Sequence, residues 1–225
     1  MATIIGGIGT SHVPTIAMAY DRKKASDPDW APLFDGYKPV ARWMAERRPD
    51  VLVFFYNDHA TTFFFDHYPT FALGVSAEYP IADEGLGPRP VPPLKGHPAL
   101  ARHMVESLVN EEFDLSVFQD LPIDHGCHSP LTMFWPPAPD WPGRIVPVEI
   151  NVLQHPLPTP LRCYKLGQLR RDHAREVVRR AAGRVRHDEP DRPRGIRLRC
   201  CRRGQRAAKE EGRSQKADLA ASPQG

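Results

Sequence analysis

The chain has 225 residues, of which 41% are hydrophobic and 25% are charged, which is the composition of an ordinary globular protein. No apolar run approaches the roughly 18 residues that a membrane-spanning helix needs. The N-terminus also lacks the basic start and apolar core of a signal peptide. These features argue against a membrane protein, and we expect a cytoplasmic one. The 25 prolines predict many loops.

Charge is distributed unevenly along the chain. Residues 1–167 carry 13 Lys and Arg against 19 Asp and Glu, a net charge of −6, whereas residues 168–225 carry 17 against 8, a net charge of +9. The second segment contains no Phe, Trp or Tyr, and 15 of its basic residues are Arg. Such a segment buries too little apolar surface to offset its chain entropy. We therefore divide the chain into a domain, residues 1–168, and an Arg-rich tail, residues 169–225.

Three interpretations of this tail remain open. It could be a disordered basic tail of the kind that mediates interactions. It could bind nucleic acid, but it lacks the aromatic side chains on which bases stack, so nucleic acid is the least favoured partner. The third interpretation is out-of-frame translation of a GC-rich gene, which yields Arg, Ala, Gly and Pro in excess. We favour this third interpretation.

Short apolar segments along the domain predict strands. Residues 3–8 are predicted to form the first one. Residues 51–56 (VLVFFY) form a continuous apolar run, as expected of a strand that is covered on both faces. Further strands are expected at residues 71–75, 114–118 and 145–150.

Two helices are predicted between these strands. Pro39 is expected in the first turn of one helix, because apolar residues follow it at helical spacing. Pro98 opens the second, whose apolar face continues to Leu108. The alternation predicts an α/β fold with a central, mostly parallel sheet flanked by helices, incomplete at the C-terminus and followed by a disordered tail. Residues 76–96 are predicted to be a long functional loop.

Two histidines follow predicted strands. His12 lies in GTSHVP after the first strand, and His59 lies in YNDHA after the second. Because ligand sites in open α/β sheets gather at the carboxyl ends of strands, these side chains are placed to converge. Imidazole suits Fe, Zn, Cu or Ni, and two His with one carboxylate form the site of non-haem Fe(II) oxygenases. On the residues alone, each could equally be a loop histidine that hydrogen-bonds to the backbone.

Neighbouring polar residues have two possible roles each. Asp58 could orient His59 as a metal ligand or could cap a turn. His125, beside Asp124, could act as an acid or base or as a hydrogen-bond donor to a substrate. His128 cannot be separated from His125 on chemistry alone, and both could simply stabilise a turn.

The four cysteines give no metal or disulfide pattern. Cys127, Cys163, Cys200 and Cys201 form no CxxC pair, so reduced thiols are expected. A nucleophilic pair of Cys127 with a histidine in the same loop is disfavoured, because residues so close in sequence rarely reach the required geometry.

Several motifs occur in a specific order over residues 1–168. They are IIGGIGTSHVPTIAMAYD, PLFDGYKPVARWMAERRPDVLVFFYNDHATTFF, FALGVSAEYPIADEGLGPRPVP, DHGCHSPL and VPVEINVLQHPLPTPLRCYKLGQ. In these motifs the chain resembles the LigB-type catalytic subunits of the class III extradiol dioxygenases, the family of gallate dioxygenase and the protocatechuate 4,5-dioxygenase beta chain.

The resemblance implies a function. The family carries out extradiol (meta) cleavage of catechol-type aromatic acids such as gallate or protocatechuate with Fe(II) and O2, in the catabolism of aromatic compounds. It implies that His12 and His59 are iron ligands and that His125 hydrogen-bonds a substrate oxygen. It also implies that the loop 76–96 frames the active site, and that the partner is a second copy or a small alpha-type subunit.

The resemblance ends near residue 168. There the family continues with a GTGG segment, a Ser-His pair whose histidine is the acid/base catalyst, and a later Glu that completes the iron site. Neither segment is found, and the surroundings of His187 and Glu189 match nothing in the family, so neither role is transferred to them. We interpret the C-terminal part as missing or frameshifted and expect very low activity from the chain as written. The alternative is a truncated, inactive relative.

Overall fold

The computed structural model describes residues 3–64, 66–85 and 87–168. The tail predicted at residues 169–225, including its predicted disorder, lies outside these described residues. All the described residues fall within one compact unit. Within them, no helix combines the length and apolar character that crossing a membrane requires.

A four-stranded sheet forms the centre of the fold, with the strand order β1-β6-β2-β5. Strand β1 (Val51–Tyr56) runs parallel to β6 (Arg144–Ile150), and β2 (Phe71–Gly74) runs parallel to β5 (Ser116–Phe118). Only the pairing of β6 with β2 is antiparallel. The predicted α/β fold with a mostly parallel sheet is confirmed.

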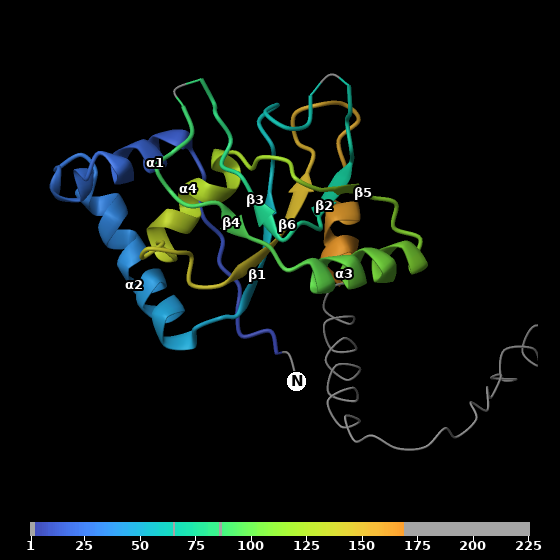
Figure 1. The fold of residues 1–225 in the computed structure, drawn as a ribbon, viewed down its shortest axis with the longest axis horizontal. Coiled ribbons are helices and arrows are strands. Elements are labelled where there is room, and N and C mark those ends of the chain that lie inside the picture. The colour runs from blue at the N-terminus through green and yellow to red at the C-terminus, as the bar shows by residue number, and fades with distance from the viewer. Residues whose placement is uncertain (1–2, 65, 86, 169–225) are drawn as a thin grey trace, which may run out of the picture. The chain divides into compact units, whose positions relative to one another are not determined.

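Three helices cover one face of this sheet (Figure 1). They are α1 (Pro14–Asp21), α2 (Ala31–Arg47) and α4 (His125–Phe134), and the short 3-10 helix η1 (Lys24–Ser26) links the first two. Their apolar side chains pack with Ala72 and Ile145 of the sheet into one core.

The other face of the sheet carries α3 (Pro98–Asn110) and the helical residues 160–168 (Figure 1). Val146 and Val148 alternate with Ile145 along β6, and they pack into this second core with Leu108 of α3. The apolar run of β6 thus reflects burial on two faces. The edge strand β1, which was predicted to be covered on both faces, is not: Val53 and Phe55 are 40% and 45% exposed.

The predicted loop 76–96 is closed at its base by a small hairpin. Strand β3 (Glu78–Tyr79) pairs antiparallel with β4 (Leu94–Lys95). The intervening residues remain a long loop, in which the placement of residue 86 is not described. Because β3 and β4 are hydrogen-bonded to each other, the two ends of the loop lie side by side.

The strand predicted at residues 3–8 is wrong. These residues have no regular secondary structure, and Ile4 and Ile5 are 63% and 45% exposed. Instead of joining the edge strand β1, the segment lies against α2. At Gly6 a Cβ would be 2.7 Å from the Trp43 ring. That close approach holds the segment away from the sheet, and a strand without a hydrogen-bonded neighbour does not form.

The predicted position of Pro39 is also wrong. Helix α2 begins at Ala31, with Pro32 in its first turn, and Pro39 lies inside the helix. A proline in a helix interior removes one backbone hydrogen bond. The apolar spacing after Pro39 indicated a helix start, but the packing of α2 against α4 carries the helix through that residue.

Gly74 lies at a tightly packed position of the core. A Cβ there would lie 2.6 Å from Tyr79 Oη and 2.7 Å from Pro147 Cγ. We expect Gly74→Ala to lower the free energy of unfolding by about 1–3 kcal/mol through overpacking. As a matched control, Gly36→Ala in the exposed middle of α2 meets nothing within 4 Å and should raise it by about 0.5–1 kcal/mol. Urea denaturation measures both, and equal stabilities of the two variants would contradict the packing described.

Glu149 is a carboxyl group buried in the sheet. It lies on β6 between Tyr56 and Ala72 of the neighbouring strands, is 2% exposed, and its Oε2 has no hydrogen-bond partner among the described residues. Burial, and then the negative charges of Asp58 and Asp124, raise the pKa of Glu149 to about 8 from 4.5. An acid whose pKa rises on folding holds its proton more tightly in the folded state, so stability falls as the pH rises through this window.

We therefore expect Glu149→Gln, which cannot ionise, to be more stable than the wild type at pH 8 by a few kcal/mol, roughly. The difference should shrink toward pH 4.5, where the wild-type carboxyl is protonated in the folded state and increasingly so in the unfolded state. Thermal unfolding followed across this range measures it. Glu78→Gln on the exposed residue of β3 is the control. A stabilisation by Glu149→Gln that does not change with pH would contradict the argument.

Candidate metal centre and active site

Three histidine rings converge at one end of the sheet. His12 lies just before α1, His59 follows β1, and His125 is the first residue of α4. The ring centroid of His59 lies 5.1 Å from that of His12 and 4.0 Å from that of His125, and the centroids of His12 and His125 are 6.2 Å apart. The structure thus brings together all three predicted site residues, although the strand expected before His12 is absent from the described residues.

Asp124 fixes the orientation of His59. One carboxylate oxygen, Oδ2, accepts hydrogen bonds from the backbone N–H of His59 at 2.8 Å and from its Nδ1 at 2.7 Å. Because a carboxylate can only accept here, Nδ1 carries the proton and Nε2 carries the lone pair. Asn57 Nδ2 donates to this Nε2 at 3.0 Å. A histidine held in this way by a carboxylate is arranged to offer Nε2 to a metal ion.

Two roles were considered for Asp58, orienting His59 and capping a turn, and the structure shows turn capping. Its carboxylate accepts hydrogen bonds from the backbone N–H groups of Thr61, Thr62 and Phe63, at 2.9 to 3.2 Å. The side chain is buried, and these bonds close the turn that follows His59. The residue that orients His59 is therefore Asp124, 65 positions away in the sequence, and not its neighbour Asp58.

His125 is paired with Glu84 and not with Asp124. Its Nδ1 donates to Glu84 Oε1, and its backbone N–H donates to Glu84 Oε2 at 3.1 Å, whereas Asp124 Oδ2 lies 3.9 Å from Nδ1. Burial lowers the pKa of His125, but the hydrogen bond and the negative charge of Glu84 outweigh it, so this pKa is raised. Glu84 was not among the site residues predicted from the sequence; the only signal was its place in the long ADEG-containing loop.

His12 has the opposite electrostatic environment. Burial, and then the nearby rings of His59 and His125, lower the pKa of His12. A neutral imidazole has a free lone pair for a metal ion. The segment before it is anchored to α2, where Tyr37 Oη donates to the backbone carbonyl of Ser11 at 3.3 Å and hydrogen-bonds to Thr10.

The described residues contain one group that could hold a metal ion by distance alone. The possible ligand atoms of His59, Asp124 and His125 all lie within 4.8 Å of one another. However, Asp124 is fully buried, and its oxygens already accept three hydrogen bonds, two from His59 and one from the backbone N–H of Gly126. Asp124 therefore orients the site, and the ring of His12 lies beside His59 as a further imidazole.

Cys127 is unsuited to nucleophilic chemistry. It is fully buried in α4, and burial raises its pKa well above the ordinary value, which removes the reactive thiolate. The disfavoured Cys–His nucleophile is thus also excluded by burial. Among the described cysteines, Cys127 and Cys163 are both free thiols, as expected.

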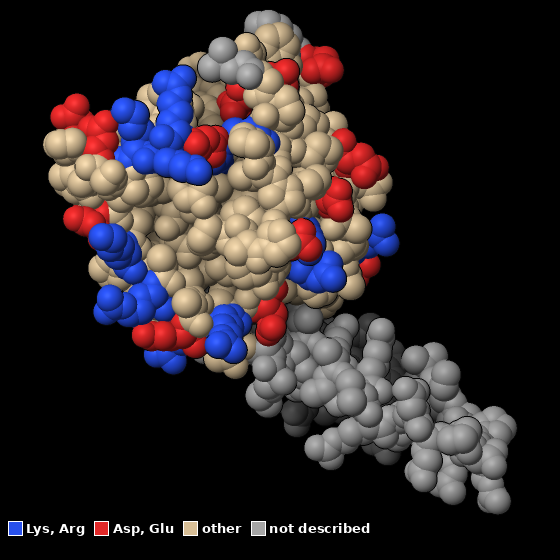
Figure 2. Space-filling model, turned by 60° about the vertical axis from the view of Figure 1, so that its left-hand side comes forward, with Lys and Arg blue, Asp and Glu red and all other residues tan. Residues whose placement is uncertain are grey.

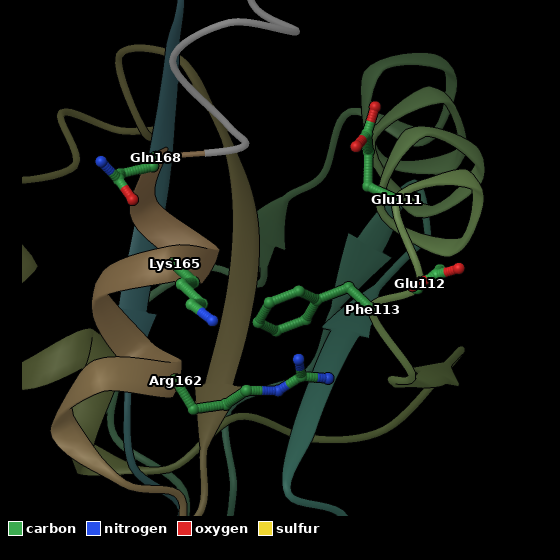
Figure 3. A pocket seen from close by; sticks show the side chains of 6 residues that line it. All are labelled: Glu111, Glu112, Phe113, Arg162, Lys165 and Gln168. Atoms are coloured by element: carbon green, nitrogen blue, oxygen red, sulfur yellow. The ribbon is translucent and has the colours of Figure 1, made fainter. Parts of the chain in front are cut away.

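A separate hollow of about 290 Å³ lies between the end of α3 and residues 160–168 (Figure 3). Phe113 points across it, and the Arg162 guanidinium lies 3.8 Å from the centre of that ring. Glu111, Glu112 and Lys165 add charges of both signs to the lining. None of the described lining residues is a histidine, so this hollow has no part in the histidine site.

The face of the molecule in Figure 2 does not carry charges of one sign. On the face in Figure 2, Lys and Arg side chains alternate with Asp and Glu around a broad uncharged area. Such a surface lacks the basic stripe that tracks a phosphate backbone. This face thus gives no support to nucleic-acid binding.

The chain spans only about a quarter to a half of the length of three curated relatives that it matches. It is 53% identical over 88 residues to a gallate dioxygenase of Pseudomonas putida, which is 39% of this chain and 26% of that protein. It is 32% identical over 163 residues to a 2,3-dihydroxyphenylpropionate/2,3-dihydroxicinnamic acid 1,2-dioxygenase of Klebsiella pneumoniae, 70% of this chain and 47% of that protein. It is also 35% identical over 121 residues to a 2,3-dihydroxyphenylpropionate/2,3-dihydroxicinnamic acid 1,2-dioxygenase 2 of Pseudomonas putida, which is 53% of this chain and 36% of that protein.

A family model matches most of the chain. The model describes the catalytic LigB subunit of aromatic ring-opening dioxygenase, and it matches residues 6–192. The matched range includes all three site histidines and continues beyond residue 168, where the resemblance was predicted to end. On this match the chain belongs to the LigB family of catalytic subunits of aromatic ring-opening dioxygenases.

Proposed function

We propose that this chain carries the iron-binding half of an extradiol dioxygenase site that opens the ring of a catechol-type aromatic acid with Fe(II) and O2. The observation that supports it is the convergence of His12, His59 and His125, with Asp124 holding the Nδ1 proton of His59 so that Nε2 carries the lone pair. A metal ion at Nε2 would replace the hydrogen bond that Asn57 donates to it. The proposal accords with family membership and with the aromatic acids in the names of the relatives, gallate and 2,3-dihydroxyphenylpropionate.

The donor set fits ferrous iron. His12 and His59 would hold it, because imidazole is a good ligand for Fe(II) and two histidines on one side of the ion leave positions open. When bound, the iron supplies a template for the adjacent substrate oxygens and O2, and a path for electrons between them. Asp124 keeps the Nε2 of His59 directed at the ion, and the lowered pKa of His12 keeps that ring able to coordinate.

His125 would act on the substrate. Glu84 holds its Nδ1, so Nε2 is the ring nitrogen that remains for a ligand beside His59. Because the pKa of His125 is raised, the ring is suited to donating a hydrogen bond to a substrate oxygen and to holding a proton taken from it. This is an acid/base and hydrogen-bonding role, distinct from metal binding.

Among the described residues, no carboxylate beside the histidines is available as a third iron ligand. Of the carboxylates beside the histidines, Asp124 is bound to His59 and Glu84 is bound to His125. A two-histidine site holds iron weakly, because ligand number sets affinity. The lack of a third ligand among the described residues favours the alternative function, that of a truncated relative without catalysis. A small second subunit or another copy of this chain is the partner we propose.

The test is anaerobic titration of the purified chain with Fe(II), compared with His12→Ala and His59→Ala. We expect one iron per chain, with binding weakened roughly tenfold or more in each variant, since even residues that only orient a ligand contribute that much. His103→Ala on α3 is the control, because His103 hydrogen-bonds only Ser107 of its own helix among the described contacts. Unchanged iron binding in both site variants would contradict the proposal.

Oxygen uptake with gallate, protocatechuate and 2,3-dihydroxyphenylpropionate then tests the reaction. We expect slow uptake that depends on His59 and on iron, with a product opened beside the two hydroxyls and not between them. Mass spectrometry of the product and an oxygen electrode measure both. Fast uptake that survives His59→Ala, or a ring opened between the hydroxyls, would contradict it.

A further inference from the structure

A line of hydrogen-bonding side chains leads from α1 to the site. Hydrogen bonds join Asp21 to Arg89, Arg89 to His128 and Glu84 to His125, and a gap of 3.8 Å separates His128 Nε2 from Glu84 Oε2. Two members of this line, Glu84 and Arg89, belong to the loop between β3 and β4, and two belong to α4. Sequence patterns assigned no role to Arg89 or Glu84 and left the role of His128 open.

Arg89 is held in place by an ion pair with Asp21. Its guanidinium grips the Asp21 carboxylate with two bonds, from Nε at 2.8 Å and from Nη2 at 2.7 Å. The side chains are only 12% and 22% exposed, so the pair is largely shielded from water. A two-point contact between a guanidinium and a carboxylate also fixes direction. It therefore ties the loop to the end of α1.

Arg89 also determines which nitrogen of His128 carries the proton. Its Nη1 donates to His128 Nδ1 at 3.1 Å. A guanidinium can only donate, so Nδ1 must accept and the proton of the neutral ring lies on Nε2. Burial, and then the charge of Arg89, lower the pKa of His128 to about 3, so the ring is neutral.

The Nε2–H of His128 is then a buried donor aimed at Glu84. The His128 side chain is 1% exposed, and its Nε2 has no hydrogen-bond partner among the described residues. The carboxylate oxygen Glu84 Oε2 lies 3.8 Å away. A shift of about 1 Å in the Glu84 side chain brings these atoms within hydrogen-bond range. An unpaired buried N–H is costly, which favours that approach.

We propose that His128 and Glu84 are positioning residues: Arg89 sets His128 as an Nε2–H donor, this donor holds Glu84, and Glu84 holds the Nδ1 side of His125. Only the role of His125 on a substrate rests on the proposed function. The hydrogen bonds from Arg89 to Asp21 and His128, and from His125 to Glu84, are properties of the folded, metal-free chain. If His128 were only a packing residue of the core, replacing it would not change the position of Glu84 or the protonation of His125.

Nitrogen-15 NMR of the histidine rings in the metal-free chain tests this directly, because it reports which ring nitrogen carries a proton. We expect His128 to be neutral with its proton on Nε2, and His125 to show a proton on Nδ1. Signals are assigned by His128→Phe and His125→Gln. A His128 ring with its proton on Nδ1 in the wild type overturns the proposal, and this arm needs no variant to fold.

Two variants test the later steps. In Glu84→Gln the Nδ1 proton of His125 should be lost or exchange faster, while that of His59 stays, because Asp124 still holds it. In His128→Phe the His125 Nδ1 proton should exchange with water roughly tenfold faster, the effect of losing about one hydrogen bond. Glu78→Gln, on the exposed residue of β3, is the matched control. A His125 signal unchanged in both variants overturns the proposal.

These measurements use neither iron nor substrate. Failure of iron to bind would therefore contradict the proposed function but would not affect the proposed positioning of Glu84 by His128. Conversely, iron binding through His12 and His59 together with an unchanged His125 signal in Glu84→Gln would support the proposed function. The same result would contradict the positioning role of Glu84.

Discussion

The geometry of the site depends on the buried carboxylate of Asp124. It caps the N-terminus of α4 by accepting the N–H of Gly126 at 3.0 Å, and it accepts both the backbone N–H and the ring Nδ1 of His59. One side chain thus joins the segment after β1 to the start of α4. The junction is tight: a Cβ on Gly126 would lie 2.5 Å from the Asn57 carbonyl oxygen. Without Asp124, neither the position of His59 nor its contact with His125 would be fixed.

This arrangement concentrates negative charge under the histidines. Burial raises the pKa of Asp124, although its hydrogen bonds to His59 oppose the shift, and the charges of Asp58 and Asp124 act in turn on Glu149. Carboxylates so close together are unfavourable unless a proton or a cation compensates them. A metal ion held by the nearby imidazoles would supply such compensation, which gives the proposed iron a stabilising role in addition to a chemical one.

Local patterns were enough to predict several elements. The apolar run at residues 51–56 predicted β1 at its observed bounds, and Pro98 opens α3 as expected. The position after a strand holds for His59 but not for His12, because residues 3–8 form no strand, so His12 was identified only through the family motif GTSHVP. The contacts that organise the site were not predictable in this way, because Asp124 and Glu84 meet their histidines across 65 and 41 positions of sequence. Likewise, only the packing of Gly6 on Trp43 shows why residues 3–8 stay out of the sheet.

The central claim is that His12 and His59 bind the same metal ion. X-ray absorption at the iron edge of the Fe(II)-loaded chain tests it most directly, because the scattering of imidazole rings identifies histidine ligands. We predict two imidazoles on iron in the wild type and one in either His12→Ala or His59→Ala. A spectrum without imidazole scattering, or one that neither substitution changes, would contradict it.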